Sequence, residues 1–209
     1  MVLSDKEIMK ELLKGELKIT PLTNAQKQIG SSSIDIRLGT EFRYLKIVKQ
    51  THFDLTGNID EIEGQINRYS EIVHVKPLEP FILHPGDFVL ASTLEYIVIP
   101  RYLTARLEGR STWGRVGLQI HSTAGFVDPG FQGSLTFELN NLGKLPLPLY
   151  PGIRISQLSF HKIDGAMTMY SDKEGSGFSN VTRTKSSTFF KDYDYQNILK
   201  NANNAKTKS

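Results

Sequence analysis

Short apolar stretches that alternate with polar residues, separated by turns rich in proline and glycine, constrain this chain of 209 residues more than any other feature. The alternation is clearest from Ser33 to Leu38 and from Leu135 to Asn140. A period of two residues is typical of a half-buried β-strand, and Pro-Gly pairs favour turns. We therefore expect a mainly β fold, either a sandwich or a distorted barrel. Further strands are predicted at Phe81–Leu83, Phe88–Ala91, Tyr96–Ile99 and Ile153–Phe160.

One helix is predicted at the start of the chain, from Ser4 to Lys14. Ser4 can cap it, Glu7 completes a capping box, and Gly15 is a typical residue at which a helix ends. Its apolar face would be formed by Ile8, Leu12 and Leu13. Charges interrupt every apolar run here, so the segment does not resemble a signal peptide or a membrane span, and we expect a cytoplasmic protein.

The chain contains no cysteine, which excludes disulfides, thiol catalysis and thiolate metal sites. It also excludes the zinc type of nucleobase deaminase, which needs cysteine ligands. The formal net charge is +3. This excess falls on the residues from Tyr170 onward, and the preceding residues are formally neutral. A basic tail is usually solvated, so nucleic-acid binding is not expected.

Arginines and hydroxyl groups gather between residues 110 and 115. Arg110 and Arg115 flank Ser111 and Thr112. Guanidinium groups offer paired N–H donors that suit phosphate oxygens, so the segment is a candidate phosphate site. The alternative is a surface loop with two ordinary arginines.

Two acidic residues follow in the same stretch of sequence. Asp128 lies between glycines and beside a proline, and it could accept a sugar hydroxyl, orient water or simply shape a turn. Glu138 lies in a predicted strand, on the face opposite Phe137 and Leu139. If that face lines a pocket, Glu138 could shuttle protons; otherwise it faces solvent. His121 is interpreted as structural.

Several ordered motifs make the chain resemble the dCTP deaminases and the related trimeric dUTPases. They begin with MVLSD at the N-terminus and SSIDIRL from Ser32. PGDFVL, with Glu95, follows, and then GRSTWGR from Gly109, HSTAGFVDPGFQG from His121 and TFELNN from Thr136. The segment from Pro151 to Leu158 closes the set.

This resemblance implies a dUTPase-like distorted barrel or jelly roll over residues 1–170, and a homotrimer with sites between subunits. It implies a bound dCTP or dUTP with Mg²⁺ on the phosphates, and no metal ligand from the protein. Residues 171–209 would form a flexible segment that closes over the nucleotide and has a disordered end. By position, Glu138 is the catalytic acid/base, with Ser111 and the backbone of Ala124 holding the attacking water. The nucleotide would be bound by Arg110, Ser111, Thr112, Trp113, Gly114, Arg115, Asp128, Thr136, Phe137, Glu138, Gln157 and Tyr170.

The tail departs from the family pattern. Gly177 and Phe178 stand where a Lys-Tyr pair is expected, Val181 stands near the position of a glutamine, and Arg183 or Lys185 could supply the missing charge. Three functions therefore stay open: a dCTP deaminase that releases dUTP or continues to dUMP, a dUTPase without deaminase activity, and a non-catalytic nucleotide-binding regulator. The Gly125-aromatic pattern after Ala124 resembles the bifunctional, dUMP-forming members.

Overall fold

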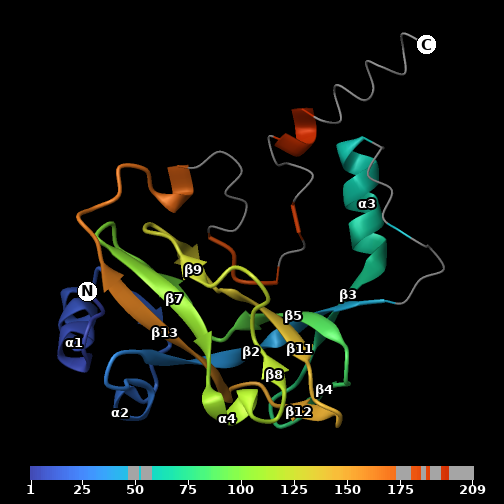
Figure 1. Ribbon diagram of the computed structural model, residues 1–209, viewed down its shortest axis with the longest axis horizontal. Helices are drawn as coiled ribbons and strands as arrows, with labels where there is room; N and C mark the ends of the chain where they lie inside the picture. The colour runs from blue at the N-terminus through green and yellow to red at the C-terminus, as the bar shows by residue number, and fades with distance from the viewer. Residues whose placement is uncertain (47–51, 53–57, 173–179, 185–186, 189–193, 198–209) are drawn as a thin grey trace. The chain divides into compact units, whose positions relative to one another are not determined.

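The computed structural model describes residues 1–46, 52, 58–172, 180–184, 187–188 and 194–197 (Figure 1). The chain divides into two compact units. The first, here called the body, comprises Met1–Tyr44 and Ile72–Lys185, and the second comprises Leu45–Glu71 and Ser186–Ser209. Within the described residues, no helix is long and apolar enough to cross a membrane.

The body is built around an eight-stranded sheet, which confirms the prediction of a mainly β fold. Seven strands follow in the order β8-β11-β5-β2-β13-β7-β9, each antiparallel to its neighbour, and β3 pairs with β2. The sheet curls around the core, with β2 and β13 as its longest strands (Figure 1). The strands are β2 (Ile34–Leu45), β3 (Ser70–His74), β5 (Phe88–Thr93), β7 (Leu103–Gly109), β8 (Leu118–Gln119), β9 (Phe126–Val127), β11 (Thr136–Asn141) and β13 (Arg154–Lys162).

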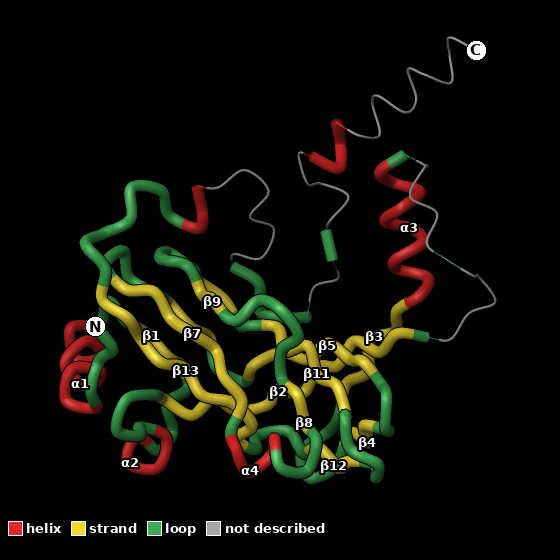
Figure 2. The backbone as a smooth tube through the Cα atoms, viewed as in Figure 1, coloured by secondary structure: helices red, strands yellow, loops and turns green. Residues whose placement is uncertain are grey.

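Two smaller sheets complete the body, and short helices lie at the margins of the strands (Figure 2). The first has the order β1-β6-β10 and the second pairs β12 with β4. The strands are β1 (Lys18–Thr20), β4 (Phe81–Leu83), β6 (Tyr96–Val98), β10 (Gln132–Gly133) and β12 (Leu147–Leu149), and the short helices are α2 (Ala25–Gln28), α4 (Ser111–Gly114) and the 3₁₀ turn η1 (Tyr170–Asp172).

Helix α1 spans Asp5–Lys14 and confirms the predicted N-terminal helix. The Ser4–Glu7 capping box is present, and Gly15 ends the helix in the left-handed conformation at φ 78°. Ile8 is fully buried, but the prediction for Leu13 was wrong, because its side chain is 81% exposed. At 100° per residue, Leu13 lies about 140° around the helix from Ile8, outside the buried stripe.

A polar contact fastens α1 to the loop before β7. The Tyr102 hydroxyl donates a hydrogen bond to Glu11 at 2.6 Å, and Lys14 pairs with the same carboxylate at 2.7 Å. Burial opposes the charge on Glu11, but these two donors outweigh it and hold the pKa of Glu11 below its ordinary value. Burial and the neighbouring carboxylate raise the pKa of Tyr102.

Alternation along the strands fills the core as expected. Phe137 and Leu139 of β11 are fully buried, as are Leu158 and Phe160 of β13. Asn141 is a buried exception at the end of β11. Its amide donates to the carbonyls of Leu83 and Leu145, both at 2.9 Å, and its oxygen accepts the Gly143 N–H at 2.9 Å. One polar side chain therefore ties strand β4 to the loop between β11 and β12.

The second unit contains helix α3, which spans Ile59–Tyr69 and was not predicted from the sequence. Asn58 and Glu61 form a capping box at its start, and Ile62 and Ile66 are buried. A capping box followed by apolar residues four positions apart is a helix signal that the sequence does carry.

Candidate functional site

Glu138 lies at the middle of β11, between two buried neighbours. The alternation of that strand turns Phe137 and Leu139 into the core, so Glu138 projects from the opposite face and is half-buried. The sequence predicted this orientation, and the structure supplies what the sequence left open: the face borders a cavity and is not simply solvent.

A cavity of about 200 Å³ opens beside this strand. It brings together five of the residues predicted for the site: Ala124, Asp128, Thr136, Glu138 and Tyr170. Sequence reasoning missed the other residues that line it: His121, Phe126, Val127, Phe131, Ser134, Leu135 and Val181. A mostly apolar hollow with a few convergent polar groups is the usual form of a small-molecule site.

The Glu138 carboxylate is oriented by one backbone donor. The N–H of Ser122 donates to Glu138 Oε2 at 2.8 Å. Glu138 Oε1 accepts no hydrogen bond from any residue in the described part of the chain. The N–H of Glu138 donates to the carbonyl of Ile120 at 3.0 Å, which holds β11 against the segment that carries Ser122. One oxygen is therefore fixed and the other can meet a ligand in the cavity.

His121 lines this cavity, although no sequence pattern distinguished it from a structural histidine. Its Nδ1 atom is buried and has no hydrogen-bond partner within the described residues, and its Nε2 atom lies 4.0 Å from Glu108. The ring also lies close to Gly125, where a Cβ would stand 3.3 Å from His121 Cε1 and 3.2 Å from the Leu107 carbonyl oxygen. The missing side chain of Gly125 thus lets this loop pack tightly against β7.

Tyr170 and Phe131 form an aromatic wall of the same cavity. Their ring centroids are 5.7 Å apart with an interplanar angle of 59°. The Tyr170 N–H donates to the carbonyl of Pro129 at 2.8 Å, which fixes η1 next to the turn that carries Asp128. Tyr170 was predicted from the resemblance to the family, and the structure places it beside Asp128 in the cavity.

The predicted phosphate segment lies elsewhere on the body. Ser111, Thr112, Gly114 and Arg115 are exposed, and Ser111–Gly114 form the short helix α4. None of them lines the cavity around Glu138. Arg115 forms no ion pair with any residue that the structure describes.

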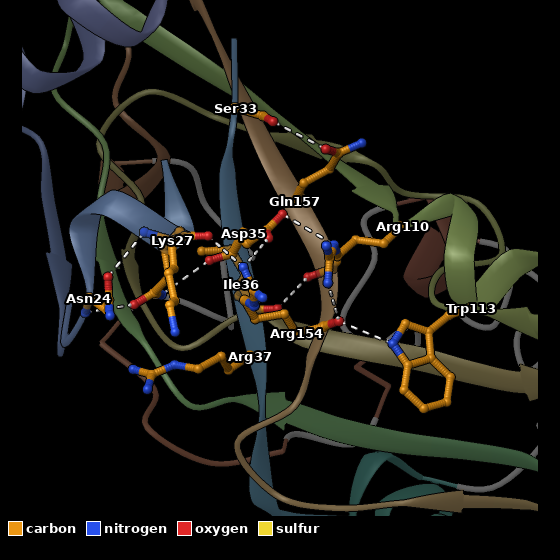
Figure 3. A network of polar contacts seen from close by, with 12 residues as sticks. Asn24, Lys27, Ser33, Asp35, Ile36, Arg37, Arg110, Trp113, Arg154 and Gln157 are labelled. Carbon is orange, nitrogen blue, oxygen red and sulfur yellow. Dashed lines mark hydrogen bonds and ion pairs between the residues drawn. The ribbon is translucent and has the colours of Figure 1, made fainter. Parts of the chain in front are cut away.

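Arg110 and Trp113 point back into the body, toward the network drawn in Figure 3. Arg110 Nε lies 3.3 Å from Asp35 Oδ1, and its Nη1 donates to the Arg154 carbonyl at 3.1 Å. Trp113 Nε1 donates to the same carbonyl at 3.1 Å. Arg154 in turn binds Asp35 Oδ2 at 3.0 Å. These bonds fix the start of α4, so its exposed residues project from a rigid base.

Gln157 also lies away from the cavity, on β13 opposite Asp35. Its side-chain oxygen accepts the Ser33 hydroxyl at 3.1 Å (Figure 3). Phe137 is the predicted site residue with the least access, because its side chain is fully buried in the core. Any contact that it makes with a nucleotide must come from its backbone. Apart from Phe137, the predicted residues thus fall into two groups: those that line the cavity around Glu138, and those that lie at α4 and around Asp35.

The amino-acid sequence of this chain matches a known protein family. A family model described as dCTP deaminase-like matches residues 2–163. A "dCTP deaminase, dUMP-forming" from Dictyoglomus thermophilum is 44% identical over 181 residues, which cover 86% of this chain and 90% of that protein. A protein with the same description from Methanothermobacter thermautotrophicus is 39% identical over 198 residues, covering 94% of this chain and 98% of that one.

A solved structure agrees at the level of the fold. The crystal structure of 2'-deoxycytidine 5'-triphosphate deaminase from Agrobacterium tumefaciens aligns with a TM-score of 0.59 at 21% sequence identity. The alignment covers 78% of this chain and 48% of the other.

Proposed function

The chain belongs to the dCTP deaminase-like family, and we propose that it deaminates dCTP at cytosine C4 and then cleaves the resulting dUTP to dUMP and pyrophosphate. The observation that carries the proposal is the Glu138 carboxylate, which lines a cavity with one oxygen fixed by Ser122 and the other available. The description "dUMP-forming" of relatives that are 39% and 44% identical favours continuation to dUMP.

Glu138 performs the proton transfers of the deamination. Its carboxylate takes a proton from water, and the hydroxide attacks C4 of the cytosine while the proton passes to N3. In the tetrahedral intermediate, Glu138 carries the proton of the new C4 hydroxyl to the amino group, the C4–N bond breaks and ammonia leaves. One water is therefore consumed and dUTP is left. Transfer by one positioned group contributes about 10²–10⁴-fold. The remaining rate enhancement comes from holding the water and the cytosine ring in the geometry that the reaction needs.

The nucleoside fits the cavity in an orientation set by its polar residues. Thr136 and Glu138 lie on one face of β11 and line the cavity, as does Asp128. In the proposed complex, Thr136 and Glu138 face the base and Asp128 accepts a hydroxyl of the deoxyribose. Tyr170 and Phe131 supply apolar surface for the sugar and base. In the second reaction, a water attacks the α-phosphate of dUTP, and the P–O bond to the β-phosphate breaks to release pyrophosphate.

The phosphates are bound by the group around α4. Arg115, Ser111 and Thr112 are exposed on a rigid base, yet they do not border the cavity of their own chain. This separation supports a homotrimer in which α4 of one subunit completes the cavity of its neighbour. Ser111 of that neighbour, with the backbone of Ala124, would hold the attacking water.

Mg²⁺ fits this arrangement through the phosphates. It prefers oxygen ligands and commonly binds substrate phosphates together with water. No group of three or more histidine, aspartate or glutamate side chains that could hold a metal ion is found in the described residues. The ion would neutralise charge on the triphosphate and on the leaving pyrophosphate, while Arg115 orients the triphosphate and Arg110 holds the start of α4 in place.

The test is to incubate the purified protein with dCTP and Mg²⁺ and to follow ammonia, dUTP, dUMP and pyrophosphate by chromatography from early times. We expect ammonia and dUMP in equal amounts. Glu138→Gln keeps the shape of the side chain but cannot shuttle a proton, so ammonia release should be lost. Glu79→Gln, at an exposed position of the body, is the matched control.

The other outcomes separate the competing functions. Conversion of dUTP to dUMP without ammonia from dCTP would identify a dUTPase. Accumulation of dUTP without dUMP after long incubation would limit the activity to deamination. Nucleotide binding without any product would identify a regulator. Near-normal ammonia release by the Glu138→Gln variant would refute the role of Glu138.

A further inference from the structure

Glu41 of β2 is a buried carboxylate outside the proposed catalytic group. Its side chain is 6% exposed, and the next residue, Phe42, is fully buried and stacked on Phe81. Two adjacent buried residues break the alternation expected of a strand. A buried charge is costly in free energy unless strong hydrogen-bond donors surround it. The groups that stabilise the Glu41 carboxylate therefore need to be identified.

A bulge in β2 turns Glu41 inward. Leu38 pairs with Thr93 and Phe42 pairs with Ala91, so the residues between Leu38 and Phe42 all face Ser92. Gly39 makes this possible, because a Cβ at that position would lie only 2.8 Å from the backbone oxygen of Ser92. Bulges of this kind redirect side chains at functional edges of sheets.

The C-terminal segment 180–184 supplies the donors for this carboxylate. The backbone N–H of Thr184 donates to Glu41 Oε1 at 2.7 Å, and the Thr184 hydroxyl donates to the same oxygen at 2.6 Å. Thr184 is itself only 4% exposed. His74 Nε2 and Arg183 Nε lie 4.0 Å from Glu41 Oε2, but both side chains are largely exposed and contribute little.

The same segment forms part of the cavity that holds Glu138. The N–H of Ser134 donates to the carbonyl of Val181 at 2.7 Å, and Val181 forms a parallel bridge with Gly133 of β10. Val181 and Ser134 both line the cavity. The segment is therefore held at two points three residues apart, by the backbone of β10 at Val181 and by Glu41 at Thr184.

We propose that Glu41 is a positioning residue: its hydrogen bonds with Thr184, here called the latch, hold segment 180–184 against β2, so that Val181 lines the nucleotide cavity before substrate binds. This proposal rests on the proposed function for the identity of the ligand, but the latch itself belongs to the ligand-free protein. Because the segment is already docked, nucleotide binding does not include the free-energy cost of ordering it. Loss of the latch would lower the fraction of molecules that are competent to bind.

Hydrogen exchange of the ligand-free protein tests the latch without reference to activity. In Glu41→Ala, the amides of Thr184 and Ser134 should exchange at least about tenfold faster than in the wild type, because both lie in the docked contact. Thr184→Val removes only the hydroxyl donor and leaves Glu41 and the backbone N–H of residue 184 in place, so it should give a smaller increase. Thr184→Ser restores the hydroxyl and should behave as the wild type.

Steady-state kinetics with dCTP tests the positioning role. If the docked fraction falls to about a tenth, KM rises about tenfold while kcat changes less than about threefold, since the chemistry in the closed complex is unaltered. A merely structural role would lower the amount of active enzyme, which changes kcat and not KM. Glu79→Ala, at an exposed site in the body, is the control for the substitution itself.

If the amides of Thr184 and Ser134 exchange as slowly in Glu41→Ala as in the wild type, the latch is refuted. Faster exchange with an unchanged KM would overturn the positioning role. If the wild type releases no ammonia from dCTP, the proposed function fails. Calorimetric binding of dCTP then replaces KM, and a dissociation constant unchanged in Glu41→Ala would overturn the proposal.

Discussion

Replacing Glu95 with glutamine would perturb the most deeply buried ion pair among the residues that the structure describes. The Glu95 side chain is 0% exposed and lies 2.6 Å from Arg37 Nε. Its second oxygen accepts the backbone N–H of Arg37 at 2.9 Å. Arg37 also donates to Thr23 at 2.9 Å and to the Pro21 carbonyl at 2.7 Å, so the pair fastens the loop between β1 and α2 to the main sheet.

The loss of folding free energy in Glu95→Gln follows from the hydrogen bonds that the substitution changes. Glutamine keeps one acceptor oxygen, but it removes the charge facing the guanidinium of Arg37, and a hydrogen bond to a charged group contributes about 1.5–3 kcal/mol. Its amide nitrogen would face the backbone N–H of Arg37, which leaves a buried donor unsatisfied at about 1–3 kcal/mol. The two contributions add to roughly 2.5–6 kcal/mol, a range that includes the roughly 3–5 kcal/mol usually lost when a buried pair is broken, and this narrower range is the one expected here.

Urea unfolding of Glu95→Gln and wild type at the same protein concentration measures this cost, because assembly would otherwise shift the result. For a chain of this size, roughly 3–5 kcal/mol corresponds to a fall in Tm of about 6–20 °C. Glu63→Gln, on the exposed face of α3, is the control and should stay within about 0.5 kcal/mol. A loss below about 1 kcal/mol for Glu95→Gln would refute the reasoning that this pair holds the loop.

Three further predictions concern assembly, packing and acid stability. Inactive Glu138→Gln chains reassembled with inactive Arg115→Ala chains should recover part of the activity if the two residues serve one site from different subunits; no recovery in verified mixed trimers would contradict this. Asn141→Ala should cost about 3–5 kcal/mol in urea unfolding, because it leaves the buried Leu83 carbonyl and the partly buried Leu145 carbonyl and Gly143 N–H without their partner. Glu11 has a depressed pKa, so its contribution to stability is complete above the ordinary carboxyl pKa and is lost as the pH falls through the lower, folded value. Tyr102→Phe removes one donor and should therefore reduce the loss of stability between about pH 7 and about pH 3; an unchanged loss would show that Tyr102 does not depress this pKa.

Rules that use only neighbouring residues predicted the structure correctly wherever those neighbours determine a residue's conformation. The Ser4–Glu7 capping box and the left-handed Gly15 bound α1 as predicted, because capping involves groups within one turn. Alternation placed Phe137 in the core and Glu138 on the other face of β11, because side-chain direction in a regular strand depends only on the backbone. The capping box at Asn58 shows that α3 was equally accessible to such reasoning.

The sequence alone therefore determined the mainly β class, the N-terminal helix, the orientation of Glu138 and, through its motifs, the resemblance to a family. Only the tertiary structure decided which residues meet. It placed Arg110 against Asp35 and Arg154, and it brought Tyr170 beside Asp128. It also buried Glu41 beneath Thr184, 143 positions along the chain. A bulge and long-range pairing bring these groups together, and because neither follows a local period, no pattern of neighbouring residues could predict them.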